Sequence, residues 1–512
     1  MDAYISGLKH IAPELVLIAV ALAALVVDLV TKGKESRRVG VLTLGGLVFT
    51  GVLLLRQWST VSAGGGAVEE TVLGLMKIDL FGLFFKLFTV GSLLVVVTFV
   101  MLDTRERKDG IGEYFFLLLG AAIGIFFMVS TNNLLLLMLG LELLSLASYS
   151  LAGFHKGDRR SAEASLKYIV FGGLSAGVML YGMSLLYGLT GTLDLVEMGA
   201  GGTEGFPVGL AAQFAVSPVP VAIAIVLVFA GFAYKVSVVP FHFWTPDVYE
   251  GAPTPVTTFL AVASKAAGFA VLLRFVGALF LVDGVHEAVT AYGDRIGLLV
   301  GVLAAVTMTL GNLSALRQKS LKRMLAYSSI AHAGYVLMGV AAMTHAGFSA
   351  AIFYLAAYYF MNLGAFGFLL YFEGITGSED IDSLKGMGWK YPFVAWAMVI
   401  FLVSLTGLPP PVGFYGKLLL FYEALDAGLA WLVVFAALNN VVSLFYYFRV
   451  AKSMFLTEPA DAEKSPQPIL SGILVALAVP TVLLGVKNDF LSNWSDQGPS
   501  SIGIVAPPEE GE

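Results

Sequence analysis

The sequence predicts an all-α membrane protein that crosses the bilayer many times. Of its 512 residues, 58% are hydrophobic and only 13% are charged, and the mean hydropathy is +0.84. A soluble protein carries about twice this share of charged residues. Apolar runs long enough to form helices that cross the hydrocarbon core recur along the chain. The runs are continuous rather than alternating, which argues against a transmembrane β-barrel.

About fourteen membrane-spanning helices are predicted. They lie roughly at 11–30, 38–56, 79–102, 112–130, 132–153, 162–190, 219–239, 255–282, 295–315, 322–343, 347–372, 392–427, 429–449 and 468–486. No cleavable leader is predicted, because the first run is long enough to span and Asp28 near its end does not resemble a cleavage site.

The twelfth predicted span is too long for one straight helix. The sequence TGLPPPVG at 406–413 interrupts it, since each proline removes a backbone donor and clashes with the preceding turn. Irregular backbone at membrane depth is tolerated only where it is buried in protein or lines a wet cavity. We therefore expect this span to face the interior of the bundle.

The composition excludes several kinds of function. Without cysteine there can be no thiolate-ligated iron–sulfur cluster, disulfide or Cys-based zinc site, and the formal charge of -6 argues against a nucleic-acid partner. No heme, flavin or nucleotide signature is found, and the glycine-rich segment 191–217 lacks the phosphate-binding pattern GxxxxGK[ST]. The six histidines are too scattered to suggest a local metal motif. No cofactor or metal site is predicted in this chain.

Lys and Arg are distributed unequally between the two sets of loops. One set of connections holds 19 Lys and Arg residues: 31–38, 103–111, 154–161, 240–254, 315–323, 373–391 and 449–467. The other set of loops and both termini together hold only four Lys and Arg residues. The positive-inside rule then places these basic loops in the cytoplasm, and both termini and the acidic segment 191–217 outside. Segment 240–254 alone among the basic-side loops has no Lys or Arg, so we expect it to pack against the bundle or a neighbour.

Ionisable side chains inside the predicted spans are the main functional signal. They are Lys86, Glu142, Lys167, Lys235, Lys265, Arg274 and Lys417. A charge at the bilayer centre costs ~3 kcal/mol or more and usually marks a functional path. A buried lysine can hold or release a proton as its surroundings change, which arginine cannot do.

These residues do not all favour the same interpretation. Lys86 and Arg274 lie near span ends, which favours snorkelling or structural pairing. Lys167, beside Glu163, is open between a structural and a proton-carrying role. His332, in SSIAHAGYV, could relay protons or be an ordinary buried histidine. Glu142, Lys235, Lys265 and Lys417, near mid-depth or beside a proline break, favour a proton path.

Two of the lysines lie beside helix interruptions. Lys235 precedes Pro240 by five residues, and Lys417 follows Pro411 by six. Broken helices at matching places in two halves are typical of inverted-repeat transporters. Span 132–153 with its acid and span 219–239 would form one half-site, and span 392–427 would supply the break in the other half. Water admitted at each interruption could connect the lysines to one surface.

Several ordered segments resemble the proton-translocating, antiporter-like subunits of respiratory complex I. They are LGLELLSLASY around Glu142, SLKYIVFGGLSAG around Lys167, PFHFWTPDVYEGAPTPVTTFLAVASKAAG at 240–268, KRMLAYSSIAHAGY from Lys322, and SLTGLPPPVGFYGKLLLF past Lys417. The DVYEGAPTPV segment resembles subunit N, the counterpart of mitochondrial subunit 2, more than the sister subunits L and M. The resemblance covers about residues 10–490 and is specific, because five separate segments agree in order.

The resemblance implies roles for individual residues. It implies a Glu–Lys pair at Glu142 and Lys235, a central lysine at Lys265, an exit lysine at Lys417 and an accessory lysine at Lys167. It also implies two inverted five-helix repeats at 112–282 and 283–449. Three helices in 1–111 precede the repeats, and a loop, a last span and an outer tail in 450–512 follow them.

The resemblance further implies a proton-translocating subunit of an NADH-quinone oxidoreductase in a bacterial inner membrane. Protons would move from the cytoplasm to the outside, driven by quinone reduction elsewhere in the complex. NADH, FMN, iron–sulfur clusters and quinone are expected in other subunits. The expected partners are other membrane subunits, including the sister antiporter-like subunits, together with the lipid bilayer and protons.

Three alternatives remain open at this point. An Mrp-type cation/proton antiporter subunit would exchange Na⁺ for H⁺ in liposomes without redox partners. The equivalent subunit of a membrane-bound hydrogenase or of a plastid-type dehydrogenase would be distinguished by the subunits that co-purify with it. A purely structural scaffold would tolerate neutral replacement of its buried lysines.

Overall fold

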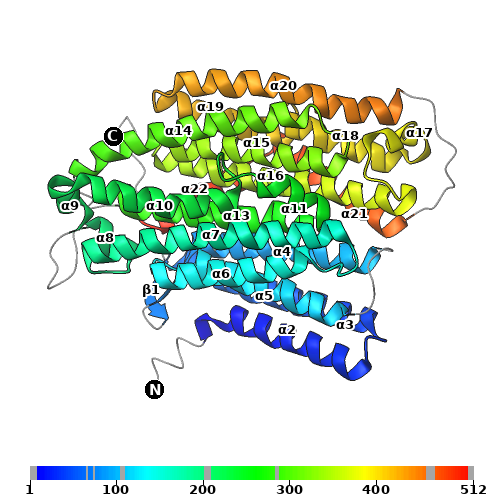
Figure 1. The fold of residues 1–512 in the computed structure, drawn as a ribbon, viewed down its shortest axis with the longest axis horizontal. Coiled ribbons are helices and arrows are strands. Elements are labelled where there is room, and N and C mark those ends of the chain that lie inside the picture. Colours follow the sequence, from blue (N-terminus) through cyan, green and yellow to red (C-terminus); the bar gives the residue numbers. More distant parts are fainter. Residues whose placement is uncertain are drawn as a thin grey trace.

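The computed structural model confirms an all-α membrane architecture (Figure 1). It describes residues 9–64, 67–72, 75–103, 110–200, 209–282, 287–456 and 467–504. The long helices lie side by side and run across the view of Figure 1 from one end of the molecule to the other. They are α2 (Ala12–Thr31), α3 (Ser36–Ala63), α4 (Leu80–Leu102), α5 (Ile111–Val129), α6 (Leu134–Ala152), α7 (Arg159–Thr190), α10 (Pro218–Val236), α13 (Lys265–Phe280), α14 (Glu287–Ala315), α15 (Leu321–Ala341), α16 (His345–Thr376), α20 (Ala430–Phe455) and α21 (Pro468–Val486).

Thirteen helices in the described part of the chain are long and apolar enough to cross a membrane. They correspond to thirteen of the predicted spans; one of them is the rod formed by α12 (Thr254–Phe259), the π-helical turn η1 (Leu260–Ser264) and α13. The predicted twelfth span is instead two helices of 15 residues each, α18 (Pro392–Thr406) and α19 (Val412–Asp426). The proline-rich interruption is therefore confirmed.

Shorter elements join or cover the bundle. One antiparallel hairpin, β1 (Ala67–Val72) and β2 (Met76–Asp79), lies at the end of the molecule that also carries α8 and α9 (Figure 1). Segment 240–254, predicted as a loop, contains the helix α11 (Trp244–Gly251), and its side chains are largely buried as expected. The remaining short helices are α8 (Leu195–Ala200), α9 (Leu210–Val216), η2 (Ile381–Leu384), α17 (Met387–Lys390) and α22 (Asp489–Ser501).

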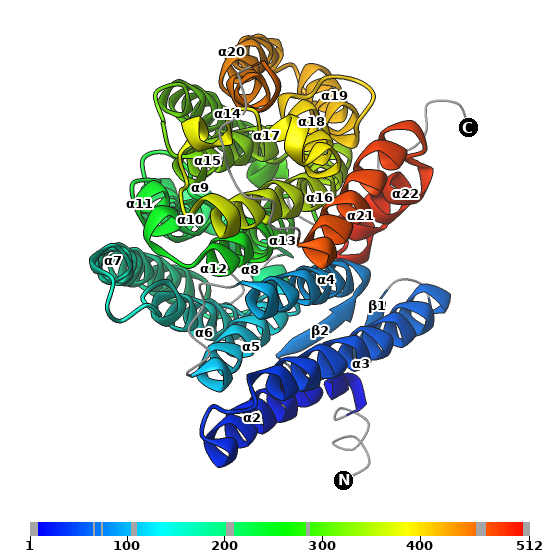
Figure 2. The ribbon, with the colours of Figure 1, turned by 90° about the vertical axis from the view of Figure 1, so that its right-hand side faces the viewer.

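The centre of the bundle is formed by the rod α12–η1–α13 together with α15 and α16. Every residue from 254 to 280 is buried, and α16 packs against α12, α15, α18, α19, α21 and α22. Helices α2 and α3 lie at one edge of the bundle and α20 at the opposite edge (Figure 2). The outer faces of these edge helices expose large apolar side chains, as expected where helices meet lipid.

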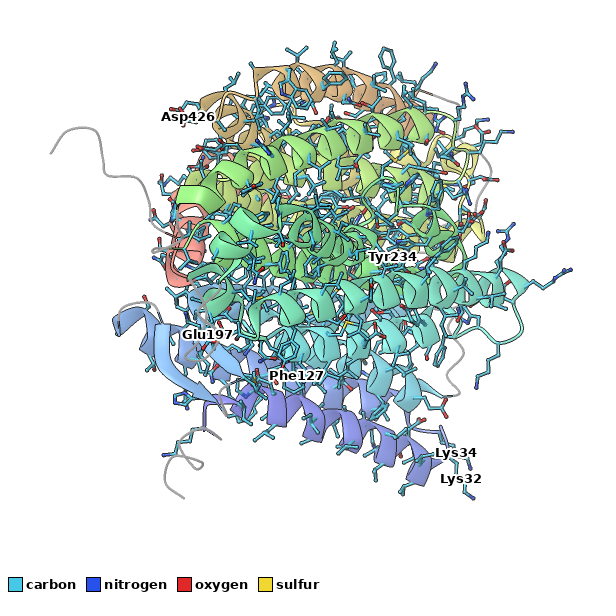
Figure 3. The ribbon with its side chains drawn as sticks, turned by 60° about the vertical axis from the view of Figure 1, so that its left-hand side comes forward. Lys32, Lys34, Phe127, Glu197, Tyr234 and Asp426 are labelled. Carbon is cyan, nitrogen blue, oxygen red and sulfur yellow. The ribbon has the colours of Figure 1, made fainter. Side chains whose placement is uncertain are left out.

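Charged loop residues separate to the two ends of the molecule. Lys32 and Lys34, from a predicted basic-side loop, lie at the end opposite Glu197 and Asp426 (Figure 3). This arrangement agrees with the two sets of loops assigned from the sequence. The predicted basic loops 103–111 and 449–467 and the acidic segment 191–217 lie partly outside the described residues.

Candidate functional site

The first helix break positions Lys235 in the last turn of α10. Helix α10 ends at Val236, where Ser237 adopts a left-handed conformation with φ of 67°. The indole Nε1 of Trp244, the first residue of α11, donates to the carbonyl oxygen of Tyr234 at 3.0 Å. The same carbonyl accepts from the backbone N–H of Ser237 at 3.1 Å, so the indole is a second donor at this helix end. The last-turn position is also electrostatically favourable for a cation, because helix carbonyls point toward it.

Lys235 and Glu142 do not form a direct ion pair, although they lie within electrostatic range of each other. The Lys235 Nζ donates to the Oγ of Ser145 on α6 at 3.3 Å, and Ser145 lies one turn from Glu142 on the same helix. The Glu142 Oε1 has no hydrogen-bond partner among the described residues. The predicted pair thus lies close together without a direct contact, and the Ser145 hydroxyl lies beside Lys235.

Lys265 lies at the start of α13, directly after the π-helical turn. Single π-helical turns inside α-helices often occur at functional sites. The Lys265 Nζ donates to the Oγ of Ser329 on α15 at 2.5 Å and to the Ser329 carbonyl oxygen at 2.9 Å. One turn further along α13, Gly268 packs against the side chain of Lys235, where an added Cβ would lie 3.2 Å from its Cγ. This close approach places α10 and α13 next to each other at Lys235.

The second helix break holds Lys417 by three hydrogen bonds. Its Nζ donates to the carbonyl oxygens of Leu405 and Thr406, both at 3.0 Å, and to the Oδ1 of Asn440 on α20 at 2.7 Å. The first two acceptors are the last residues of α18, so the ammonium group of α19 caps the negative end of the preceding helix. The Nζ also lies 4.2 Å from the centre of the Tyr335 ring.

A hydrogen-bonded group lies between Lys265 and Lys417. The Nδ1 of His332 is 2.6 Å from the Tyr354 hydroxyl, and its Nε2 is 3.1 Å from the Tyr447 hydroxyl. Tyr447 is in turn 2.5 Å from the Oγ of Ser328, the neighbour of the serine that contacts Lys265. His332 is close enough to both lysines to interact with their charges. This position favours a role for His332 as a proton relay over that of an ordinary buried histidine.

Lys167 lies apart from this row, in a network of charges at the basic-loop end. Its side chain is 35% exposed, and its Nζ pairs with Glu163 at 2.7 Å and with Asp247 of α11 at 2.6 Å. Arg323 of α15 contacts the other oxygen of Asp247 at 2.8 Å. Burial opposes ionisation of Asp247, but the hydrogen bonds from Lys167 and Arg323 outweigh it and lower the pKa of this carboxyl group. The network anchors α11 to α7 and α15.

Lys86 and Arg274 belong to buried ion pairs, which supports the structural interpretation. The Lys86 Nζ lies 2.6 Å from the Oε1 of Glu14, and both side chains are almost fully buried. Arg274 makes two parallel bonds of 2.8 Å to the carboxylate of Asp79. A bidentate pair of this kind compensates the loss of hydration with good geometry. The two pairs attach the N-terminal helices α2 and α4 to the bundle.

Two buried charged residues lie at the ends of predicted spans: Lys322 was predicted to begin the span 322–343, whereas Glu373 was assigned to the loop 373–391, which was wrong. Lys322 is in the first turn of α15 and Glu373 in the last turns of α16, with exposures of 3% and 1%. The signal for Lys322 is Ser320, which caps α15 by accepting a hydrogen bond from the backbone N–H of Arg323. A serine at this position indicates that the helix begins before the lysine.

The described residues contain no group of three or more His, Asp or Glu side chains that could hold a metal ion. The groups that the structure does bring together are ammonium, carboxyl, imidazole and hydroxyl groups linked by short hydrogen bonds. Such groups can accept and donate protons but supply no redox centre of their own.

Comparisons with known proteins agree with this arrangement. Residues 131–443 match the protein family described as NADH:quinone oxidoreductase/Mrp antiporter, transmembrane. The NADH-quinone oxidoreductase subunit N 2 of Sorangium cellulosum is 44% identical over 496 residues, which cover 94% of this chain and 95% of that protein.

Solved structures show the same relationship. A chain of respiratory complex I from Thermus thermophilus is 32% identical, with a TM-score of 0.76 and coverage of 94% of this chain and 98% of that chain. A chain of the Mrp complex from Dietzia sp. is 22% identical, with a TM-score of 0.81 and coverage of 96% and 97%, which shows a shared fold. The chain belongs to the NADH:quinone oxidoreductase/Mrp antiporter family and, within it, to the subunit N proteins of NADH-quinone oxidoreductase.

Proposed function

We propose that this chain is the proton-translocating subunit N of an NADH-quinone oxidoreductase in a bacterial inner membrane. The names of its relatives support the complex, and one observation supports the role of the chain within it. That observation is a row of titratable side chains that begins at the half-buried Glu142 and continues through the buried Lys235, Lys265, His332 and Lys417. Unlike Lys86 and Arg274, which lie in buried ion pairs, the three lysines of this row have no ion-pair partner among the described residues, so the row needs a function.

The open Glu142–Lys235 pair is the proposed switch. Lys235 has one weak hydrogen bond of 3.3 Å, so the approach or withdrawal of the Glu142 carboxylate decides how well its ammonium form is stabilised. Glu142 is only half-buried on α6 and can respond to a neighbouring subunit. When the carboxylate withdraws, Lys235 loses its stabilising partner and passes its proton toward Lys265.

The middle and the end of the row carry the proton onward. Lys265 contacts Ser329, and from there Ser328, Tyr447 and His332 supply hydroxyl and imidazole groups toward Lys417. Lys417 then releases the proton to the outer side. The direction, with basic loops in the cytoplasm and both termini outside, follows from the distribution of Lys and Arg.

Two further assignments are part of the proposal. Lys167 acts indirectly, by holding α11 in place through Asp247 at the end of the first break. The units 112–282 and 283–449 are the two inverted repeats. Their two breaks, α10–α11 and α18–α19, each bring a lysine to a helix end. Electron transfer, with NADH, FMN, iron–sulfur clusters and quinone, belongs to other subunits.

The experiment is a replacement of Lys235 in the intact complex. Lys235→Met removes the titratable group and keeps a similar side-chain length, so we expect the complex to assemble but to lose NADH-driven proton pumping. Pumping is measured with a pH-sensitive dye in inverted membrane vesicles, quinone reduction by absorbance, and assembly on native gels.

A matched control removes a buried ammonium group that lies outside the row. The double variant Lys86→Met with Glu14→Leu deletes a buried ion pair as a unit, which is often neutral for stability. It should pump normally. Wild-type pumping by the Lys235→Met complex would exclude the proposed path.

A further inference from the structure

A second cluster of titratable groups lies at the basic-loop end of the bundle, away from the row described above. Glu373 is 1% exposed near the end of α16, Lys322 is 3% exposed at the start of α15, and the side chain of Glu379, just beyond α16, is 24% exposed. The cluster therefore reaches from a partly exposed carboxyl group to a fully buried one. Burying three ionisable groups together at a helix end is costly, so the cluster needs an explanation.

The hydrogen bonds of the cluster connect four elements. The Lys322 Nζ donates to the carbonyl oxygen of Ala252 at 2.8 Å and to the Oε1 of Glu379 at 3.4 Å. The hydroxyl of Thr254, at the start of the central rod, donates to the Oε2 of Glu373 at 2.7 Å. Glu379 also lies close enough to Glu373 for the two carboxyl groups to interact electrostatically.

Two carboxyl groups beside a single ammonium group carry a net negative charge when both are ionised. A single proton held by the two carboxyl groups leaves the buried cluster electrically neutral. Burial raises the pKa of Glu379, Lys322 opposes the rise, and the neighbouring Glu373 adds to it. Among the described residues, Lys322 and Glu373 are the charged groups that act on Glu379. The charge balance and the burial of the pair therefore favour a proton held between the two carboxyl groups.

The cluster shares helix faces with the groups around Lys265. Lys322 and Ser329 lie seven positions apart on α15, which puts them about two turns and ~10 Å apart on one face. Asn362 and Glu373 lie eleven positions apart on α16, about three turns apart on one face. Ser329 is the residue that contacts Lys265. The surface cluster and the central lysine are thus aligned along the same two helices.

Unpartnered polar groups occupy the space between them. The hydroxyls of Tyr249 and Tyr358 and the Nδ2 of Asn362 are buried, and none of these atoms has a hydrogen-bond partner among the described residues. Both tyrosine hydroxyls lie near Ser329, and Tyr358 also lies near Asn362. Buried donors without protein partners are the places where structures hold ordered water. The interval is ~10 Å along α15 and ~16 Å along α16, which corresponds to about four to six hydrogen-bonded links.

We propose that Glu373 and Glu379, held by Lys322, form the loading site at which a proton enters this chain from the basic-loop side and passes to Lys265. The inference rests on the proposed function, since it supplies the entry that the row of buried lysines requires. Glu379 takes up the proton from the aqueous side, and Glu373 receives it in the buried position. Tyr249, Tyr358, Asn362 and bound water carry it to Ser329 and the Lys265 amine, while Glu379 reloads. A plain structural anchor would need only Lys322 and one carboxylate.

Chemical labelling of the assembled complex tests whether the pair holds a proton. A hydrophobic carbodiimide adds to a protonated carboxyl group in an apolar site and rearranges to a stable N-acylurea, which mass spectrometry locates. We expect Glu373 or Glu379 to be labelled at pH 7, less so as the pH rises. Glu250 is the control, because it has a similar exposure of 26% but is paired with Arg323 at 2.6 Å. Equal labelling of all three residues would overturn the shared-proton assignment.

Variants in the same complex test the loading role. We expect Glu373→Gln and Glu379→Gln to lower proton pumping by about tenfold at pH 8 and by less at pH 6, where protons are more abundant. Glu379→Asp keeps a titratable group and should recover most of the rate. Glu250→Gln should leave both the rate and the pH profile unchanged.

The outcomes separate this inference from the proposed function. If Lys235→Met abolishes pumping but both glutamine variants keep the wild-type rate and pH profile, the row stands and the loading site is wrong. If Lys235→Met pumps normally, the proposed function itself fails. Should the glutamine variants not assemble, the labelling of the wild-type complex decides.

Discussion

The two helix breaks hold their lysines in opposite ways. At the first break, Lys235 belongs to the helix that ends there, and an indole N–H from Trp244 donates to a terminal carbonyl of that helix. At the second break, Lys417 belongs to the helix that begins there, and its own ammonium group satisfies the last carbonyls of α18. The carbonyls at a buried helix end thus accept from neutral backbone and indole N–H groups at the first break, and from the charged lysine itself at the second.

This difference explains why the two lysines are suited to different tasks. Lys417 has three acceptors within 3.0 Å and a facing aromatic ring, so its charged form is stabilised by fixed groups. Lys235 has one contact at 3.3 Å and a carboxylate that is near but not touching. Because Glu142 can move relative to it, the charge of Lys235 depends on a movable partner. We infer that the charge of Lys235 at the first break is switched by Glu142, whereas the charge of Lys417 at the second break is stabilised by fixed groups.

The largest expected difference is in local stability after loss of each ammonium group. Lys417→Met leaves two helix-end carbonyls and an amide oxygen without a donor, so we expect the α18–α19 region to lose about 2–4 kcal/mol. Lys235→Met removes one weak contact and a buried charge, and the α10–α11 region should change by about 1 kcal/mol or less. Hydrogen exchange of the two regions, read by mass spectrometry, measures both values.

Both variants should lose proton pumping, which makes stability the discriminating readout. Equal loss of exchange protection at the two breaks would contradict the distinction between a switching and a holding lysine.

A smaller effect is expected from the glycine that makes room for Lys417. Gly407 has φ of +84°, and an added Cβ would lie 2.7 Å from the Cδ of Lys417. In Gly407→Ala the lysine stem must move away from its acceptors, and we expect proton pumping to fall by about tenfold.

Gly428→Ala provides the matched control for this variant. Its φ is +74°, so it carries a similar backbone cost of about 1–2 kcal/mol, but nothing lies within 4 Å of the added Cβ. Pumping should stay at the wild-type rate. A similar loss in both alanine variants would mean that backbone strain, and not the position of Lys417, sets the rate.

The sequence predicts the helical frame of the site well, because membrane insertion imposes strong local rules. Each span needs a long apolar run, and the prolines at 409–411 make one straight helix from 392 to 427 impossible. Lys235 and Lys417 can be placed beside the breaks because proline and lysine are both visible in the chain. Proline and lysine positions are therefore enough to locate the second break and its lysine correctly.

The contacts within the site depend on tertiary packing and could not be predicted in this way. Nothing in the local sequence indicates that Lys417 reaches back to α18 and across to Asn440. The separation between the Glu142 carboxylate and the Lys235 ammonium group is likewise set by the relative positions of α6 and α10. Glu373 was placed in a loop because hydropathy averages over a window and locates helix ends only to within a few residues.

The smallest predicted effect concerns α11, an element that follows the first break and has no counterpart between α18 and α19. Asp247 attaches it to Lys167 and Arg323. Because the pKa of Asp247 is lowered in the folded protein, its contribution is fully present above the ordinary carboxyl pKa of about 3.9 and is lost only as the pH falls below it. Asp247→Asn should therefore destabilise the docking of α11 by about 1 kcal/mol, and by the same amount at pH 8, 6 and 5. Hydrogen exchange of α11 relative to wild type measures this cost. The control is Asp382→Asn: the Asp382 carboxylate pairs with Lys385 but is 82% exposed, so its replacement should cost nothing measurable. If the destabilisation caused by Asp247→Asn disappeared between pH 8 and pH 5, a group other than the Asp247 carboxylate would hold α11. The first break would then not depend on Asp247 as an anchor.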